Sequence, residues 1–130
     1  MSEIPKDLRY SEEHEYVKRA EEPDTVYVGI TDYAQGELGD IVYVELPTVG
    51  ASYGKRDVFG TIEAVKAVSE LFSPVAGEIV AVNERLDKDP QVVNTAPYTD
   101  GWMVKMKLAD PADMDALLDA GAYTKLVGEG

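Results

Sequence analysis

The alternation of hydrophobic and polar positions predicts a chain built mainly from short β-strands. Thr25–Ile30 (TVYVGI) has the β-branched and aromatic residues typical of a strand, and turn residues precede it at Glu21–Asp24. Glu15–Lys18 is the candidate hairpin partner of this strand. Trp102–Leu108 predicts a further strand, with Trp102, Val104 and Met106 on its buried face and the lysines facing outward.

Between these strands, residues 40–101 show short β segments separated by glycines and prolines. Such punctuation is typical of an antiparallel sandwich or barrel. The predicted strands are Ile41–Leu46, Val58–Val65, Leu71–Phe72, Glu78–Val82 and Gln91–Val93.

Two segments predict helices instead. Thr31–Gly39 begins with an N-cap threonine and ends at a glycine, although Gly36 inside it is unfavourable. Pro111–Ala120 follows the N-cap Asp110 and precedes Gly121, which could end the helix. The apolar stripe of this second helix, expected to pack on the sheet, consists of Met114, Leu117 and Leu118.

A weak internal repeat divides the predicted β region. Gly39–Val44 (GDIVYV) and Gly77–Val82 (GEIVAV) share the pattern Gly, acid, Ile, Val, any residue, Val. Two related halves folded about a pseudo-twofold axis would produce it. The stretch EAVKAVSE, Glu63–Glu70, lies between the two copies, so we expect it to form a hairpin at one extremity.

Composition narrows the possible functions. The 130 residues fit one domain, 1–130, with a single core. Asp and Glu number 25 against 12 Lys and Arg, for a net charge of -13, which disfavours binding to nucleic acids or anionic membranes and favours basic partners. The absence of cysteine excludes disulfides and thiolate chemistry.

The N-terminus has no signal-peptide pattern, so we expect a cytoplasmic protein.

No conventional catalytic constellation is visible. The chain has one histidine and no glycine-rich phosphate loop, so we expect neither an enzyme nor a metal site. The acidic pairs Glu12-Glu13 and Glu21-Glu22 could in principle act as a glycosidase couple, but in so acidic a chain they are better interpreted as solvated surface. Attention therefore falls on Lys66, the one basic residue between Arg56 and Arg85, whose neighbours in EAVKAVSE are small or β-branched.

Six blocks spread over almost the whole chain match a known family in their order. They are His14–Val17, Gly29–Gln35, Leu38–Pro47, Phe59–Lys66, Ser73–Glu78 with Asn83, and Pro97–Met103. Through these blocks the chain resembles the H-protein family of the glycine cleavage system, which carries lipoic acid on a lysine. Departures are mild, with Tyr16 where the family often has Trp and Glu70 where it often has Asp.

The resemblance implies a lipoyl/biotinyl-carrier-like fold, a flattened barrel-sandwich hybrid of two pseudo-twofold-related halves with short flanking helices. It divides the domain into N-terminal strands and a short helix (1–39), a β-sandwich core (40–108) and a C-terminal helix (110–121). It also implies that Lys66 bears the lipoyl group, and that Glu63 and Gly77 match positions that the attaching enzymes recognise.

By the same resemblance, the chain is a shuttle in one-carbon metabolism. Its partners would be a pyridoxal-phosphate glycine decarboxylase, a tetrahydrofolate-dependent aminomethyltransferase, a flavin-dependent dihydrolipoyl dehydrogenase and the lipoate-attaching enzymes. A loaded lipoyl arm ends in an amine, which we expect to fold back onto carboxylates. The candidate arm-docking residues are His14, Glu15, Ser69 and Glu70.

The sequence is also compatible with other functions. A biotin carrier normally sets its lysine between methionines, where this chain has Val65 and Ala67. A lipoyl domain of a 2-oxo acid dehydrogenase is shorter and tethered by a linker. The chain could instead relay lipoyl groups to other proteins through Lys66, or serve as an interaction module.

Overall fold

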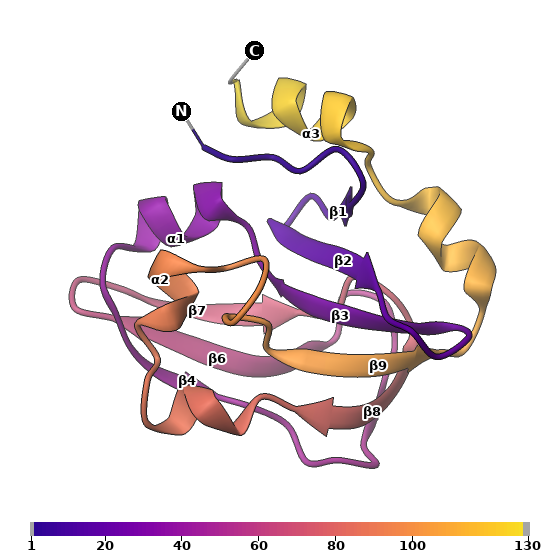
Figure 1. Cartoon of the computed structure of the whole chain (residues 1–130), viewed down its shortest axis with the longest axis horizontal. Coiled ribbons are helices and arrows are strands. Elements are labelled where there is room, and N and C mark those ends of the chain that lie inside the picture. Colours follow the sequence, from indigo (N-terminus) through magenta and orange to yellow (C-terminus); the bar gives the residue numbers. More distant parts are fainter. Residues whose placement is uncertain (1, 129–130) are drawn as a thin grey trace.

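A computed structural model, which describes residues 2–128, shows two antiparallel sheets around a shared core (Figure 1). The six-stranded sheet has the order β1-β2-β3-β9-β8-β5, and the three-stranded sheet has the order β4-β6-β7. The strands are β1 (Arg9–Tyr10), β2 (Glu15–Arg19), β3 (Thr25–Ile30), β4 (Ile41–Glu45), β5 (Ser52–Tyr53), β6 (Val58–Ala64), β7 (Val68–Phe72), β8 (Gly77–Val82) and β9 (Val104–Leu108). The predicted mainly β sandwich is therefore confirmed.

Short helices flank the sheets. They are α1 (Asp32–Leu38), α2 (Val92–Thr95), α3 (Ala120–Val127) and the 3₁₀ helices η1 (Glu84–Asp87) and η2 (Pro111–Ala116). Helix α1 begins and ends as its sequence predicts, because the Thr31 hydroxyl accepts a hydrogen bond from Ala34 N–H and Gly39 follows with a φ of 86°. Among residues 2–128, no helix has the length and apolar character needed to cross a membrane.

The main core lies between the two sheets and is filled by their inward-facing side chains. The six-stranded sheet contributes residues such as Val28 and Met106, and the three-stranded sheet contributes Val44, Ile62 and Leu71. All five are at most 1% exposed, which is the burial that drives two half-apolar sheets together.

The internal repeat is present in the fold as well as in the sequence. Its first copy forms β4 and its second forms β8, so the copies lie in different sheets. Each copy has a β-bulge at the same position, between Ile41 and Tyr43 in β4 and between Ile79 and Ala81 in β8. An irregularity repeated in the same place supports two structurally related halves.

Two predicted elements are wrong. Gln91–Val93 is not a strand, because α2 occupies this region. The C-terminal helix does not run from Pro111 to Ala120. It is the short η2, followed by extended residues and then α3, which contains Gly121.

The break in the C-terminal helix has a tertiary cause. Leu118 pairs through both backbone groups with Tyr10 of β1, at 2.8 Å in each direction, which removes it from any helix. Asp119 then caps α3 by accepting from Ala122 N–H. The predicted stripe is divided accordingly, since Met114 and Leu117 pack on the main core and Leu118 on a separate cluster.

The predicted buried face of the last strand is partly wrong. Val104 and Met106 are fully buried, but β9 begins at Val104, so Trp102 lies outside the ladder and is partly exposed. Its ring packs edge-on to Tyr27, with centroids 5.2 Å apart, while Met103 is buried instead.

A second, smaller cluster joins the two ends of the chain. It contains Leu8, Tyr10, Tyr16, Tyr98 and Tyr123. Figure 1 shows the segments that supply its end members, with α3 next to the N-terminal segment. Tyr10 and Tyr123 are stacked with ring centroids 4.6 Å apart. Through Tyr123, the C-terminal helix reaches the turn between β1 and β2, which borders the site described next.

Candidate functional site

Lys66 lies at the tip of the hairpin between β6 and β7, with its side chain exposed. The turn is closed by Ala64 N–H donating to the Ala67 carbonyl at 2.7 Å. It is also tied to the neighbouring link between α1 and β4, because Val65 N–H donates to the Asp40 carbonyl at 3.0 Å. The tip is thus held in place on two sides while the lysine stays free of the ladder.

The Lys66 side chain lies against Gly39. A β-carbon placed at Gly39 would come within 3.1 Å of the Lys66 Cε, and the φ of +86° at Gly39 disfavours any larger residue there. Glycine at this position therefore leaves room for the lysine stem beside the end of α1.

Asn94 of α2 forms hydrogen bonds to the segment that joins α1 to β4, next to the hairpin tip. Its side-chain amide donates to the Gly39 carbonyl and to the Gln35 side chain, each at 2.9 Å, and its carbonyl accepts from Ile41 N–H at 2.8 Å. No sequence signal indicated this role, because residues 91–93 predicted a strand.

The two predicted recognition residues occupy different sheets. Glu63 is exposed on β6, in register with Tyr43 of β4 and Val68 of β7. Gly77 is buried at the start of β8 in the six-stranded sheet, where a β-carbon would lie 2.4 Å from the Lys107 carbonyl oxygen. The geometry thus gives Gly77 a packing reason of its own.

The four candidate arm-docking residues all line one cleft of about 250 Å³. It lies between the β1–β2 turn, α1 and the edge strand β7, and its wall includes His14, Glu15, Ser69 and Glu70. Two further carboxylates, which sequence reasoning missed, belong to Glu13 and Glu37. The apolar part of the wall is formed by Ile30, Tyr33, Ala34, Leu38, Ile62 and Leu71.

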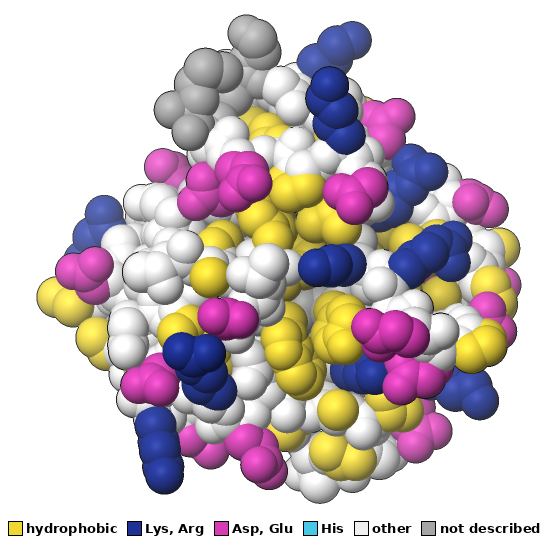
Figure 2. Space-filling view, in the orientation of Figure 1, with side chains coloured by type: hydrophobic (Ala, Val, Ile, Leu, Met, Phe, Trp, Pro, Cys, Tyr) yellow, Lys and Arg dark blue, Asp and Glu magenta, His cyan; other side chains and the backbone are white. Residues whose placement is uncertain are grey.

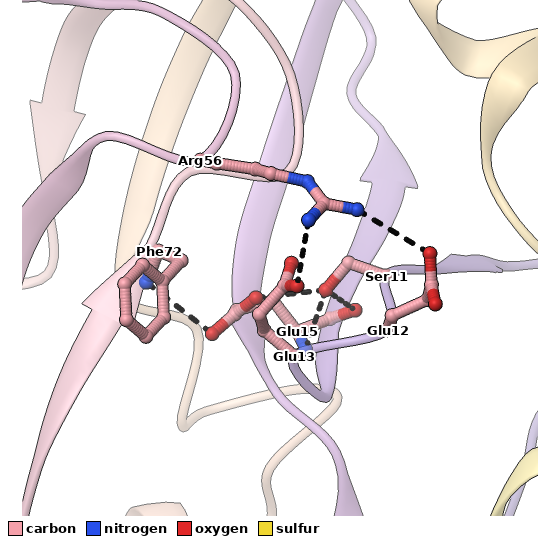
Figure 3. A network of polar contacts seen from close by, with 6 residues as sticks. All are labelled: Ser11, Glu12, Glu13, Glu15, Arg56 and Phe72. Atoms are coloured by element: carbon pink, nitrogen blue, oxygen red, sulfur yellow. Dashed lines mark hydrogen bonds and ion pairs between the residues drawn. The ribbon is translucent and has the colours of Figure 1, made fainter.

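Glu15 is the most unusual acidic residue in this cleft, because the residue is only 2% exposed. Its oxygens accept from the Ser11 hydroxyl at 2.7 Å and, more weakly, from Phe72 N–H at 3.4 Å (Figure 3). Burial raises the pKa of Glu15 to about 8, and the two hydrogen bonds oppose that shift only in part. At neutral pH the Glu15 carboxyl is therefore mostly protonated, and a cation bound beside it would favour its ionised form.

The same burial predicts an unusual pH dependence of stability. A folded-state pKa raised above the ordinary value of 4.5 gives a contribution that is complete below pH 4.5 and is lost as pH rises through 8. Glu15→Gln, neutral at every pH, should match the wild type near pH 4 and exceed its unfolding free energy by about 2 kcal/mol or more at pH 8.5. Urea unfolding from pH 4 to 9 measures this difference, and parallel curves for the two proteins would contradict it.

Arg56 braces the turn that carries these residues. Its guanidinium contacts Glu12 at 3.3 Å and Glu13 at 3.7 Å, joining the segment before β6 to the β1–β2 turn (Figure 3). The Arg56 side chain is 66% exposed in both pairs, although Glu13 is only 26% exposed, so the pairs contribute little to stability. Their effect is to place the Glu13 carboxylate at the border of the cleft.

His14 is held from the C-terminal side of the molecule. Its Nδ1 lies 2.8 Å from the Tyr123 hydroxyl, which in turn lies 2.8 Å from the Thr31 hydroxyl. Burial lowers the pKa of His14, despite opposing effects of Glu13 and Glu37, so the ring is neutral at pH 7. A neutral imidazole beside carboxylates leaves the cleft attractive to a cation.

The chain is similar to known proteins over almost its whole length. The family model described as Glycine cleavage H-protein matches residues 8–130. A glycine cleavage system H protein of Opitutus terrae is 55% identical over 128 residues, which cover 98% of this chain and 100% of the relative. One of Pelodictyon phaeoclathratiforme is 56% identical over 126 residues, covering 97% and 98%.

A solved structure is similar over the same extent. The crystal structure of a glycine cleavage system H protein from Mycobacterium marinum matches with a TM-score of 0.86 and 37% sequence identity. The match covers 96% of this chain and 99% of that one.

Proposed function

The chain belongs to the glycine cleavage H-protein family, and we propose that Lys66 is the residue on which it carries lipoic acid. Members of this family are carriers rather than catalysts, so the chain is a lipoyl carrier of the glycine cleavage system. A lipoyl group held on Lys66 would supply a disulfide. One of its sulfurs would accept the aminomethyl group as glycine decarboxylase releases carbon dioxide, its removal by the aminomethyltransferase would leave a dithiol, and dihydrolipoyl dehydrogenase would reoxidise that dithiol. We also propose that this exchange takes place in the cytoplasm.

The observation that supports Lys66 is its position. It projects from a turn fixed by two backbone hydrogen bonds, and it is the one basic residue between Arg56 and Arg85. A ligase can reach an amine on so exposed a tip without disturbing the sheets.

Peptide fragmentation after lipoylation tests the assignment. The purified chain is incubated with lipoate, ATP and a lipoate–protein ligase, and its mass is then measured before and after digestion. We expect one lipoyl adduct, carried by the peptide that contains Lys66. An adduct on another residue would overturn the assignment.

We further propose that the cleft beside α1 receives the loaded end of the arm. The Lys66 stem lies against Gly39, and Leu38 and Glu37, which precede Gly39, line the cleft. The apolar wall suits an aliphatic chain, and Glu15 and Glu70 suit a terminal cation. His14 and Ser69 complete the polar side, so all four docking candidates would border the bound end.

Removing the two carboxylates should shorten the life of the loaded carrier. Glu15→Gln with Glu70→Gln keeps size and polarity but removes the charges that pair with the amine, so the isolated loaded protein should lose its aminomethyl group about tenfold faster. Intact mass spectrometry over time measures the loss. The control is Glu78→Gln with Glu84→Gln, two exposed acids outside the cleft, and equal lifetimes for the two double variants would rule out the docking.

A further inference from the structure

The outer face of the three-stranded sheet carries an exposed aromatic residue among carboxylates. Tyr43, Glu63 and Val68 are directly opposite one another across β4, β6 and β7, so their side chains share this face. Tyr43 is 47% exposed and Val68 69% exposed. Glu45, two residues beyond Tyr43 on β4, is also exposed. We call these four residues the outer face of the small sheet.

The other half of the molecule differs from this face at the matching positions. By the internal repeat, Tyr43 corresponds to Ala81. Tyr43 pairs with Glu63 on the neighbouring strand, and Ala81 pairs in the same way with Lys105, so Lys105 occupies the position that matches Glu63. Lys105 is neutralised there, because its Nζ lies 2.8 Å from the Glu22 carboxylate. Figure 2, which views the molecule as in Figure 1, shows cationic and acidic side chains interspersed on one face.

The outer face of the small sheet has no such compensation. Within residues 2–128, neither Glu45 nor Glu63 forms an ion pair. The first copy of the repeat also has the large aromatic side chain of Tyr43 where the second copy has the small Ala81. Carboxylates without a cationic partner around exposed apolar side chains fit a partner with a basic rim and an apolar pocket. Aromatic residues in this setting are frequent binding hot spots.

The reach of Lys66 identifies which partner must contact this face. An unmodified lysine amine extends only about 6 Å from its backbone, since it lies five single bonds from Cα. The enzyme that attaches lipoate must therefore press closely against the hairpin tip and its flanking strands. Enzymes that act later meet the far end of a long arm and can bind at a greater distance.

We propose that the outer face of the small sheet is the footprint of the lipoate-attaching enzyme, which binds it with a basic, apolar-centred surface. The proposal rests on Lys66 as the attachment residue. It extends recognition from the hairpin itself to Tyr43 and Glu45 on β4, a strand distant in sequence from the lysine.

Initial rates of lipoylation at varied concentrations of the unmodified chain test the footprint. Tyr43→Ser and Glu45→Lys should each raise the KM for the chain about tenfold and change kcat less than twofold, because neither residue touches the reacting amine. The KM of the wild type should also rise with salt, and this rise should be weaker for Glu45→Lys.

Val80→Ser and Glu78→Lys provide the matched control on the other sheet. Val80 is 39% exposed and Glu78 is exposed, and both lie in the second copy of the repeat, so these variants should keep the wild-type KM. An unchanged KM in Tyr43→Ser and Glu45→Lys, with the adduct still on Lys66, would overturn the footprint alone. An adduct elsewhere would instead overturn the proposed attachment residue.

Discussion

Lys66→Arg should abolish lipoylation completely. Arginine keeps the positive charge and the length of the side chain, but its guanidinium stays protonated at any working pH and cannot act as the acyl-accepting amine. Because residue 66 is exposed and outside the β ladder, the fold should be unaffected. The expected result is a variant with wild-type unfolding behaviour, no lipoyl mass and no glycine cleavage activity with the other three proteins.

Lys88→Arg is the appropriate control, since this lysine is also exposed but lies in the loop after η1. It should acquire one lipoyl group at the wild-type rate. Intact mass spectrometry distinguishes the two variants directly. A lipoyl adduct that persists on Lys66→Arg would show that another amine is modified and would remove the basis for the shuttle assignment at this hairpin.

Gly77→Ala should destabilise the protein by at least about 2 kcal/mol. The added methyl group would lie 2.4 Å from the carbonyl oxygen and 3.2 Å from the carbonyl carbon of Lys107, and neither backbone atom can move without disturbing the pairing of β8 with β9. Urea unfolding monitored by circular dichroism measures the loss. An unfolding free energy within 0.5 kcal/mol of the wild type, where ordinary surface substitutions lie, would contradict this steric reason.

Gly36→Ala is the control for the same substitution. A β-carbon at Gly36 meets no atom within 4 Å, and the residue lies inside α1, so alanine should stabilise the protein by about 0.5–1 kcal/mol. Comparing Gly77→Ala with Gly36→Ala distinguishes a steric clash at Gly77 from a general effect of adding a methyl group.

The Gly77 variant also addresses recognition. If Gly77 matters to the attaching enzymes through the fold alone, the folded fraction of Gly77→Ala should be lipoylated at the wild-type rate. A lower rate for fully folded protein would instead indicate direct recognition at this position.

The sequence was most informative where a local rule was sufficient. The strand at Thr25–Ile30 follows from its β-branched residues, and α1 follows from Thr31 and Gly39 at its ends. The hairpin around Lys66 was predictable because stiff apolar segments flank it, and the repeat of Gly39–Val44 in Gly77–Val82 was visible as letters alone.

Predictions failed where a distant segment competes with the local preference. Residues 111–120 contain every signal for one helix, but the backbone of Leu118 pairs with Tyr10, more than a hundred residues earlier in the chain. Gln91–Val93 has strand-forming residues, yet the segment is helical at α2, where Asn94 bonds to Gly39 and Ile41. Propensity is a weak preference that such contacts override.

By itself, then, the sequence determined the β class of the fold, the exposed lysine hairpin and, through its resemblance to a family, the carrier function. Tertiary structure alone decided that Glu15 is buried beside Ser11 and that Glu13 and Glu37 line the same cleft. It also decided that Tyr43 lies beside Glu63 on an exposed face. The reason is physical: local patterns fix which way each strand faces, whereas pKa shifts, clefts and docking faces arise from side chains brought together by the packing of two sheets.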